Sequence, residues 1–91
     1  METITQIAEI FKHIVESIVD YPDKVLVSPI QDREGFVLKI TVVNNDIGKV
    51  IGKQGRTARS LRTIAQALSM KYRIPIALDI TDGALRIGPR D

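Results

Sequence analysis

Apolar residues recur along the first twenty positions with the spacing of one face of an α-helix. They fall at i, i+3, i+4 and i+7 intervals, at Ile4, Ile7, Ala8, Phe11, Ile14, Val15 and Ile18. The pair Tyr21-Pro22 follows, and proline cannot continue a helix. The pattern therefore predicts an amphipathic helix that ends near Asp20 and covers a core with its apolar face.

Two runs rich in β-branched and apolar residues come next. They cover residues 24–30 (KVLVSPI) and 36–43 (FVLKITVV), and the turn-forming stretch QDREG separates them. Pro29 cannot donate to a strand ladder, which places the first run at the edge of a sheet. The second run is apolar at nearly every position, which predicts a strand buried on both faces.

Two further helices and a third strand complete the pattern. Asn45 or Asp46 offers a cap for a short helix over 47–51, a Gly-Lys-Gln-Gly turn follows, and apolar periodicity predicts a longer helix over 56–72. Pro75 ends this helix, and residues 74–80 (IPIALDI) predict a strand.

The predicted order is α-β-β-α-α-β, in one domain over residues 1–80 of the α+β class. A crossover that contains two helices normally joins parallel strands, so we expect a three-stranded mixed sheet with the helices on one face. Residues 81–91 contain two glycines and a proline. We interpret them as a tail that could add a short strand at 84–87.

The composition is that of an ordinary small globular domain. The chain has 91 residues, of which 44% are hydrophobic and 26% charged. Cysteine is absent, which excludes disulfides and thiolate metal sites and suits a cytoplasmic location. No apolar run approaches the roughly 20 residues of a membrane span, and the acidic N-terminus does not resemble a signal peptide.

The net charge of +2 is distributed very unevenly. Residues 1–46 carry four Lys or Arg and eight Asp or Glu, whereas residues 47–78 carry seven basic residues and no acidic one. Within the longer helix, Arg56, Arg59, Arg62 and Arg73 share a sector opposite the apolar one. Such a concentrated positive region attracts polyanions, although a row of charges can also be an ordinary solvated surface.

The turn at 52–55 combines the features of an anion site. Gly52 and Gly55 allow positive φ angles and a close approach of main chain to a ligand. The following helix start leaves N–H groups without intrahelical partners, and Lys53, Arg56 and Arg59 add full charges. A bare tight turn between two helices would need only the glycines. The added charges favour phosphate binding.

Other kinds of site find little support. A mononucleotide P-loop would need glycine where Ile47 stands and a hydroxyl residue where Gln54 stands. His13 has no nucleophile or ligand cluster nearby in the sequence, and Asp79 and Asp82 are more typical of turn chemistry than of a metal pair. We therefore expect no enzyme activity, no metal and no cofactor.

The stretch DIGKVIGKQGRTARSLRTI at 46–64 resembles the KH domain, whose GxxG loop clamps about four nucleotides of a single strand. The element order resembles the bacterial type II KH fold, and the short chain resembles small bacterial KH-domain RNA-binding proteins of the KhpA type. The resemblance implies that the sugar-phosphate backbone is contacted by Gly52, Lys53, Gln54, Gly55, Arg56 and Arg59. It implies that the side of the groove where the bases lie is lined by Ile47, Val50, Ile51 and Ala58. The resemblance makes Lys49 and Arg62 peripheral contacts.

The resemblance also implies a cellular setting. It suggests an RNA chaperone or post-transcriptional regulator linked to cell elongation and envelope growth, which forms a homodimer or pairs with a larger Jag/KhpB-type RNA-binding protein. The chain departs from many KH domains at Ala58, where they carry a large aliphatic residue, and none of its four aromatic residues lies beside the loop in the sequence. We expect weak single-stranded RNA binding of low specificity. A KH-fold protein–protein interaction module with little RNA affinity is the alternative.

Overall fold

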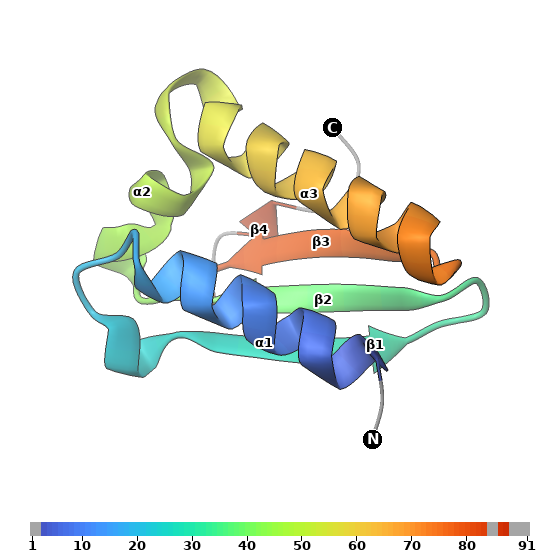
Figure 1. Ribbon diagram of the computed structural model, residues 1–91. Coiled ribbons are helices and arrows are strands. Elements are labelled where there is room, and N and C mark those ends of the chain that lie inside the picture. Colours follow the sequence, from blue (N-terminus) through green and yellow to red (C-terminus); the bar gives the residue numbers. More distant parts are fainter. Residues whose placement is uncertain (1–2, 84–85, 88–91) are drawn as a thin grey trace.

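The computed structural model describes residues 3–83 and 86–87 (Figure 1). Its helices are α1 (Thr3–Glu16), α2 (Ile47–Ile51) and α3 (Arg56–Tyr72), and its strands are β1 (Leu26–Gln31), β2 (Phe36–Thr41), β3 (Ile76–Thr81) and β4 (Arg86–Ile87). Short 3₁₀ turns lie at η1 (Pro22–Lys24), η2 (Asn44–Asp46) and η3 (Lys53–Gly55). The predicted order α-β-β-α-α-β is confirmed.

The strands form one mixed sheet in the order β1-β2-β3-β4. The pair β1–β2 is antiparallel, β2–β3 is parallel, and β3–β4 is antiparallel. The expected three-stranded mixed sheet corresponds to β1, β2 and β3. The two residues of β4 pair only with Ile80 and Thr81 and lie in the segment where the sequence suggested a short strand.

Helices α1 and α3 lie on the same face of the sheet, and the core lies between them and the strands (Figure 1). Leu38 and Ile40 of β2 are fully buried, whereas Lys39 between them is exposed. The prediction that this strand is buried on both faces is therefore wrong. The helices cover one face only, and alternate side chains of a strand point to opposite faces.

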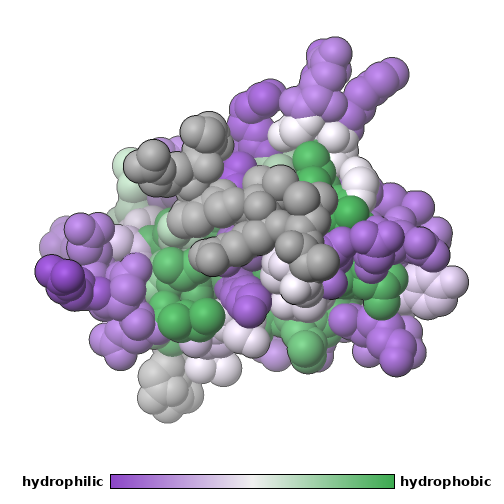
Figure 2. All heavy atoms as spheres, turned by 180° about the vertical axis from the view of Figure 1, so that it is seen from behind, coloured by the Kyte–Doolittle hydropathy of each residue, from purple (hydrophilic) through white to green (hydrophobic). Residues whose placement is uncertain are grey.

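The opposite face of the sheet carries apolar residues of its own. Register places Leu26 and Ile30 of the edge strand β1 on the same face as Thr41 and Val37 of β2. Leu26 is 61% exposed and Ile30 is 49% exposed. Figure 2 shows hydrophobic residues gathered on this side of the molecule.

The start of α2 is held by Asp46, whose side chain is fully buried. The sequence predicted a helix cap at Asn45 or Asp46, and Asp46 does occupy the cap position, but its carboxylate makes no capping hydrogen bond. It accepts the backbone N–H groups of Asp20 at 3.1 Å and Tyr21 at 3.0 Å instead. The carboxylate therefore ties α2 to the segment that follows α1.

Candidate nucleic-acid interface

The turn between α2 and α3 has a backbone that depends on glycine. Gly52 (φ 78°, ψ 170°), Gln54 (φ 57°) and Gly55 (φ 75°) all have positive φ angles. A Cβ atom on Gly52 would lie 2.7 Å from Cβ and 2.8 Å from the backbone nitrogen of Thr57. The requirement for glycine that the sequence suggested is therefore both conformational and steric at position 52. Gln54 holds a left-handed conformation that costs a non-glycine residue roughly 1–2 kcal/mol.

The main chain of the turn offers fewer donors than the sequence suggested. The N–H of Gly55 donates to the carbonyl of Gly52 at 3.0 Å, and the N–H of Arg56 donates to the carbonyl of Lys53. Within the described residues, no hydrogen bond engages the N–H groups of Lys53 and Gln54. The main-chain part of an anion site would therefore consist of these two groups.

Cationic side chains surround the same turn. Lys53 and Arg56 are exposed, and Nη2 of Arg59 donates to the carbonyl of Gln54 at 3.3 Å, which places its guanidinium beside the turn. In the described part of the chain, none of these three side chains has an ion-pair partner. Their positive charge is thus available to an anion.

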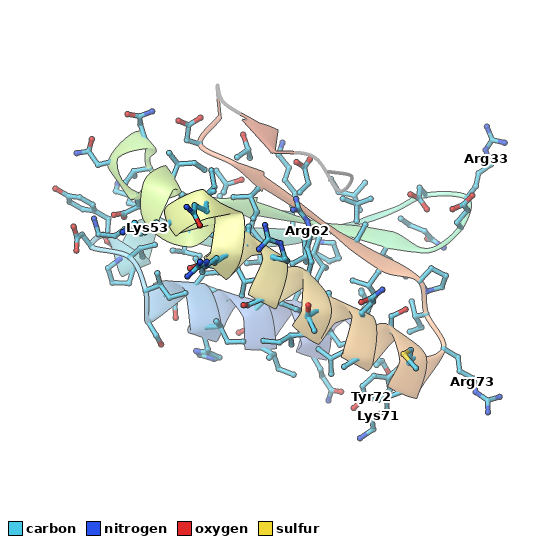
Figure 3. The ribbon with its side chains drawn as sticks, turned by 90° about the horizontal axis from the view of Figure 1, so that it is seen from above. Arg33, Lys53, Arg62, Lys71, Tyr72 and Arg73 are labelled. Carbon is cyan, nitrogen blue, oxygen red and sulfur yellow. The ribbon has the colours of Figure 1, made fainter. Side chains whose placement is uncertain are left out.

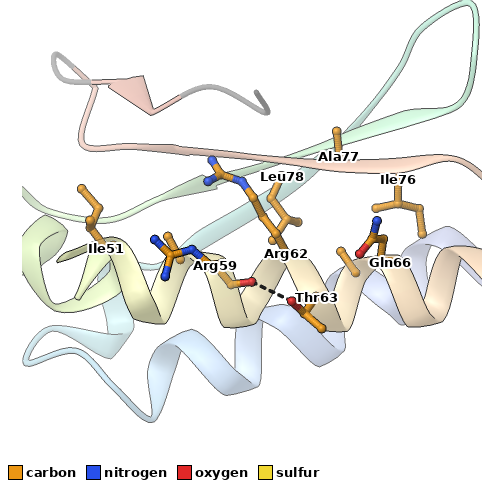
Figure 4. Close-up of a pocket in the computed structure, with 11 residues that line it drawn as sticks. Ile51, Arg59, Arg62, Thr63, Gln66, Ile76, Ala77 and Leu78 are labelled. Carbon is orange, nitrogen blue, oxygen red and sulfur yellow. Dashed lines mark hydrogen bonds between the residues drawn. The ribbon is translucent and has the colours of Figure 1, made fainter. Parts of the chain in front are cut away.

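A groove of about 580 Å³ runs from this turn between α3 and β3 (Figure 4). It is lined by Ile51, Gly55, Ala58, Arg59, Arg62, Thr63, Ala65, Gln66, Ile76, Ala77 and Leu78. The last three residues are consecutive, so their side chains alternate between the faces of the sheet, and the groove must follow the edge of β3. Among the described residues, β4 pairs with β3 only at Ile80 and Thr81.

Five of the predicted site residues reach the groove, namely Ile51, Gly55, Ala58, Arg59 and Arg62. Arg62 was expected to be peripheral, but it is half-buried and extends from α3 toward β3 (Figures 3 and 4). Its position one turn after Arg59 places it over the strand. Arg62 therefore lines the groove between α3 and β3.

Other predicted residues lie outside the groove. Val50 is fully buried in the core, so the expectation that it lines the base side is wrong. Ile47 is half-buried against the core and is not among the residues that line the groove. Lys49 forms an ion pair with Asp20. Arg73 follows the end of α3 in a left-handed conformation, at the opposite end of the molecule from Lys53 (Figure 3).

Sequence reasoning missed part of the groove wall. Thr63 and Gln66 follow Arg59 at i+4 and i+7 and so share its helix face, a signal that was present in the sequence. Ile76, Ala77 and Leu78 come from a strand ten or more residues further along, and only the folded chain shows that this strand lies beside α3.

The described residues contain no cluster of three or more His, Cys, Asp or Glu side chains that could hold a metal ion. In the same part of the chain, no helix is both long enough and apolar enough to cross a membrane. The site is thus defined by a cationic turn and a groove of mixed polar and apolar lining.

The family model for the KH domain of KhpA/KhpB matches residues 8–80. This chain belongs to that family. Its order of elements and its mixed sheet are those of a type II KH domain, as the sequence indicated. A KH domain of this family is a binding module rather than an enzyme, as expected.

Curated relatives in this KH family align with this chain over most of their own length. The protein named RNA-binding protein KhpA from Halalkalibacterium halodurans is 44% identical over 71 residues, which cover 78% of this chain and 93% of the relative. The protein of that name from Streptomyces coelicolor is 50% identical, over 66% of this chain and 76% of the relative. The protein of that name from Chlamydia trachomatis is 32% identical, over 81% of this chain and 95% of the relative. No solved structure matches the chain significantly.

Proposed function

We propose that this KH domain binds single-stranded RNA without catalysing a reaction. The observation that carries the proposal is a cationic turn, unneutralised within the described residues, that opens directly onto a groove of mixed polar and apolar lining. The relatives named RNA-binding protein KhpA support the same reading. A phosphate backbone supplies the regular negative charges that such a turn attracts.

The turn would bind the phosphates of the RNA, and the groove would contact its bases. The N–H groups of Lys53 and Gln54, with the side chains of Lys53, Arg56 and Arg59, would hold phosphates and set the position of the strand. Ile51 and Ile76 would offer apolar contacts to the bases inside the groove. None of the described aromatic residues lines the groove, so stacking on aromatic rings would add little affinity or specificity.

The double variant Lys53→Asp with Gln54→Asp tests this proposal. Fluorescence anisotropy with a labelled oligouridylate should show loss of binding, while circular dichroism and the melting temperature stay unchanged, since both residues are exposed and aspartate tolerates positive φ. The variant Lys24→Asp with Gln31→Asp makes the same changes at exposed positions outside the groove and should retain binding. Unchanged binding by the turn variant would refute the proposal.

The salt dependence of the wild-type protein gives a second check. If about three phosphates are neutralised, the logarithm of the binding constant should fall with the logarithm of salt concentration with a slope of roughly −2. A slope near zero would show that phosphate contacts do not dominate.

The wider role that fits such binding is that of a cytoplasmic RNA chaperone or post-transcriptional regulator connected with cell elongation and envelope growth. The family membership supports this part of the proposal. Sequencing of RNAs crosslinked to the intact protein, compared with the turn variant in the same cells, would identify the bound transcripts. Recovery of identical transcripts with both proteins would contradict a role for the turn.

A protein-binding role has an observation of its own. A second hollow of about 420 Å³ lies between α1 and the last residue of α3, and Ile10 and Tyr72 in its wall are each at least 40% exposed. We propose that this surface supports self-association or pairing with a KhpB-type partner. None of the residues lining it lines the groove, so RNA binding and pairing can coexist. Light scattering should show a smaller assembly for Ile10→Asp if the surface is used.

A further inference from the structure

Lys49 lies on α2, outside the groove, and its charge is held by a neighbouring acid. Its Nζ atom lies 3.2 Å from Oδ2 of Asp20, and the two side chains are 44% and 67% exposed. Lys49 belongs to α2, which ends at Ile51 directly before the turn that contains Lys53. The ion pair thus lies on the helix that leads into the cationic turn, and neither of its residues lines the groove.

The position of Asp20 does not depend on this ion pair. Its backbone N–H donates to Oδ1 of the buried Asp46 at 3.1 Å, and the next N–H, of Tyr21, donates to Oδ2 at 3.0 Å. These two hydrogen bonds fix the segment after α1 against the start of α2. The backbone of Asp20 is thereby held beside α2, and its carboxylate lies within ion-pair distance of Lys49, in the role that a phosphate oxygen could take.

We propose that the nucleic-acid track continues past the turn onto α2, where Lys49 takes one further phosphate and Asp20 holds this lysine when no strand is bound. The inference rests on the proposed RNA binding and extends it to a strand longer than the groove accommodates. A phosphate that binds Lys49 replaces the carboxylate oxygen of Asp20 as the partner of the lysine. The negative charge of this phosphate then lies close to that of Asp20. Asp20 therefore lowers the affinity for longer strands and leaves short ones unaffected.

The variant Asp20→Asn tests this exchange. It removes the negative charge but keeps the backbone N–H that Asp46 accepts, so the fold should be preserved. With oligouridylates of about four and about eight nucleotides, we expect the affinity for the longer one to rise between about 1.5-fold and fivefold at low salt, the range for an exposed ion pair. The shorter one should bind as before. For the longer oligonucleotide, the slope of the logarithm of the binding constant against the logarithm of salt concentration should steepen by about 0.7.

Asp23→Asn provides a matched control, because it makes the same change of charge at an exposed position of η1 three residues further on. Lys49→Gln should weaken the longer oligonucleotide only and should abolish the effect of Asp20→Asn when the two are combined. Equal gains for both lengths, or equal gains from Asp20→Asn and Asp23→Asn, would reveal a general charge effect and overturn the inference.

The two proposals fail in different ways. The short oligonucleotide reports on the turn and the groove, so its binding, and the loss of that binding in the Lys53→Asp, Gln54→Asp variant, test the proposed function. If the short oligonucleotide binds in this way but Asp20→Asn leaves the longer one unchanged, only the extension onto α2 is refuted.

Discussion

Replacing Gly52 by alanine should destabilise the protein much more than the same replacement at Gly55, although both residues belong to the GxxG turn. A Cβ atom on Gly52 would contact the backbone nitrogen of Thr57 at 2.8 Å, and main chain at the start of α3 cannot move aside cheaply. At Gly55 the nearest atom to a new Cβ is Nη2 of Arg59, at 3.9 Å. Of these two glycines, only Gly52 would therefore lose stability through a steric clash of the added Cβ atom.

The backbone angles separate the two glycines further. Gly52, at φ 78° and ψ 170°, lies in a region populated almost only by glycine, with a cost of about 1–3 kcal/mol for other residues. The contact with Thr57 adds about 1–3 kcal/mol. Gly55, at φ 75° and ψ 14°, is left-handed helical and costs alanine about 1–2 kcal/mol. We therefore expect a loss of about 2–6 kcal/mol at Gly52 and about 1–2 kcal/mol at Gly55.

Urea denaturation followed by circular dichroism measures both losses. Small domains have total stabilities of about 5–15 kcal/mol, so Gly52→Ala should shift the midpoint strongly or unfold the protein, whereas Gly55→Ala should remain folded. Equal shifts for the two variants would refute the assigned turn geometry. The comparison also bears on function, because lost RNA binding in Gly52→Ala would reflect unfolding as well as the altered turn.

Two further substitutions probe the start of α2 and the end of α3. Asp46→Ala should lower the free energy of unfolding by about 2–4 kcal/mol, because it removes a buried carboxylate that accepts two N–H groups. The control Asp23→Ala should change the free energy of unfolding by less than about 0.5 kcal/mol. Similar urea midpoints for the two variants would contradict the anchoring role of Asp46. Arg73→Gly should raise stability by about 0.5–1 kcal/mol, since Arg73 is left-handed (φ 58°, ψ 40°) at the end of α3, where glycine is favoured. A lower thermal midpoint for this variant would count against that explanation.

Local signals were sufficient for the helices that carry the turn. The bounds predicted for the two helices, residues 47–51 and 56–72, agree with α2 and α3, because glycines separate them and a proline follows the second. The third strand begins at Ile76 rather than at residue 74. Arg73 turns left-handed directly after α3, and the chain needs two more residues to reach the sheet.

The apolar residues that line the groove were predicted less well than the charges that surround the turn. The charges and glycines at 52–59 are contiguous in sequence, so their proximity follows from chain connectivity alone. Val50 and Ile51 are equally apolar neighbours, yet Val50 is buried in the core and Ile51 lines the groove. Which of two adjacent side chains lines the groove depends on how α2 is rotated against the sheet, and this rotation is set by contacts with distant residues.

The sequence by itself determined the class of fold, the order of its elements and the cationic glycine turn, because periodicity, helix-breaking residues and charge act over a few neighbouring positions. Tertiary structure alone decided that β2 is buried on one face, that β3 forms the second wall of the groove, and that Asp20 holds Lys49. Each of these depends on residues ten or more positions apart in the chain, which meet only after the helices have packed on one side of the sheet.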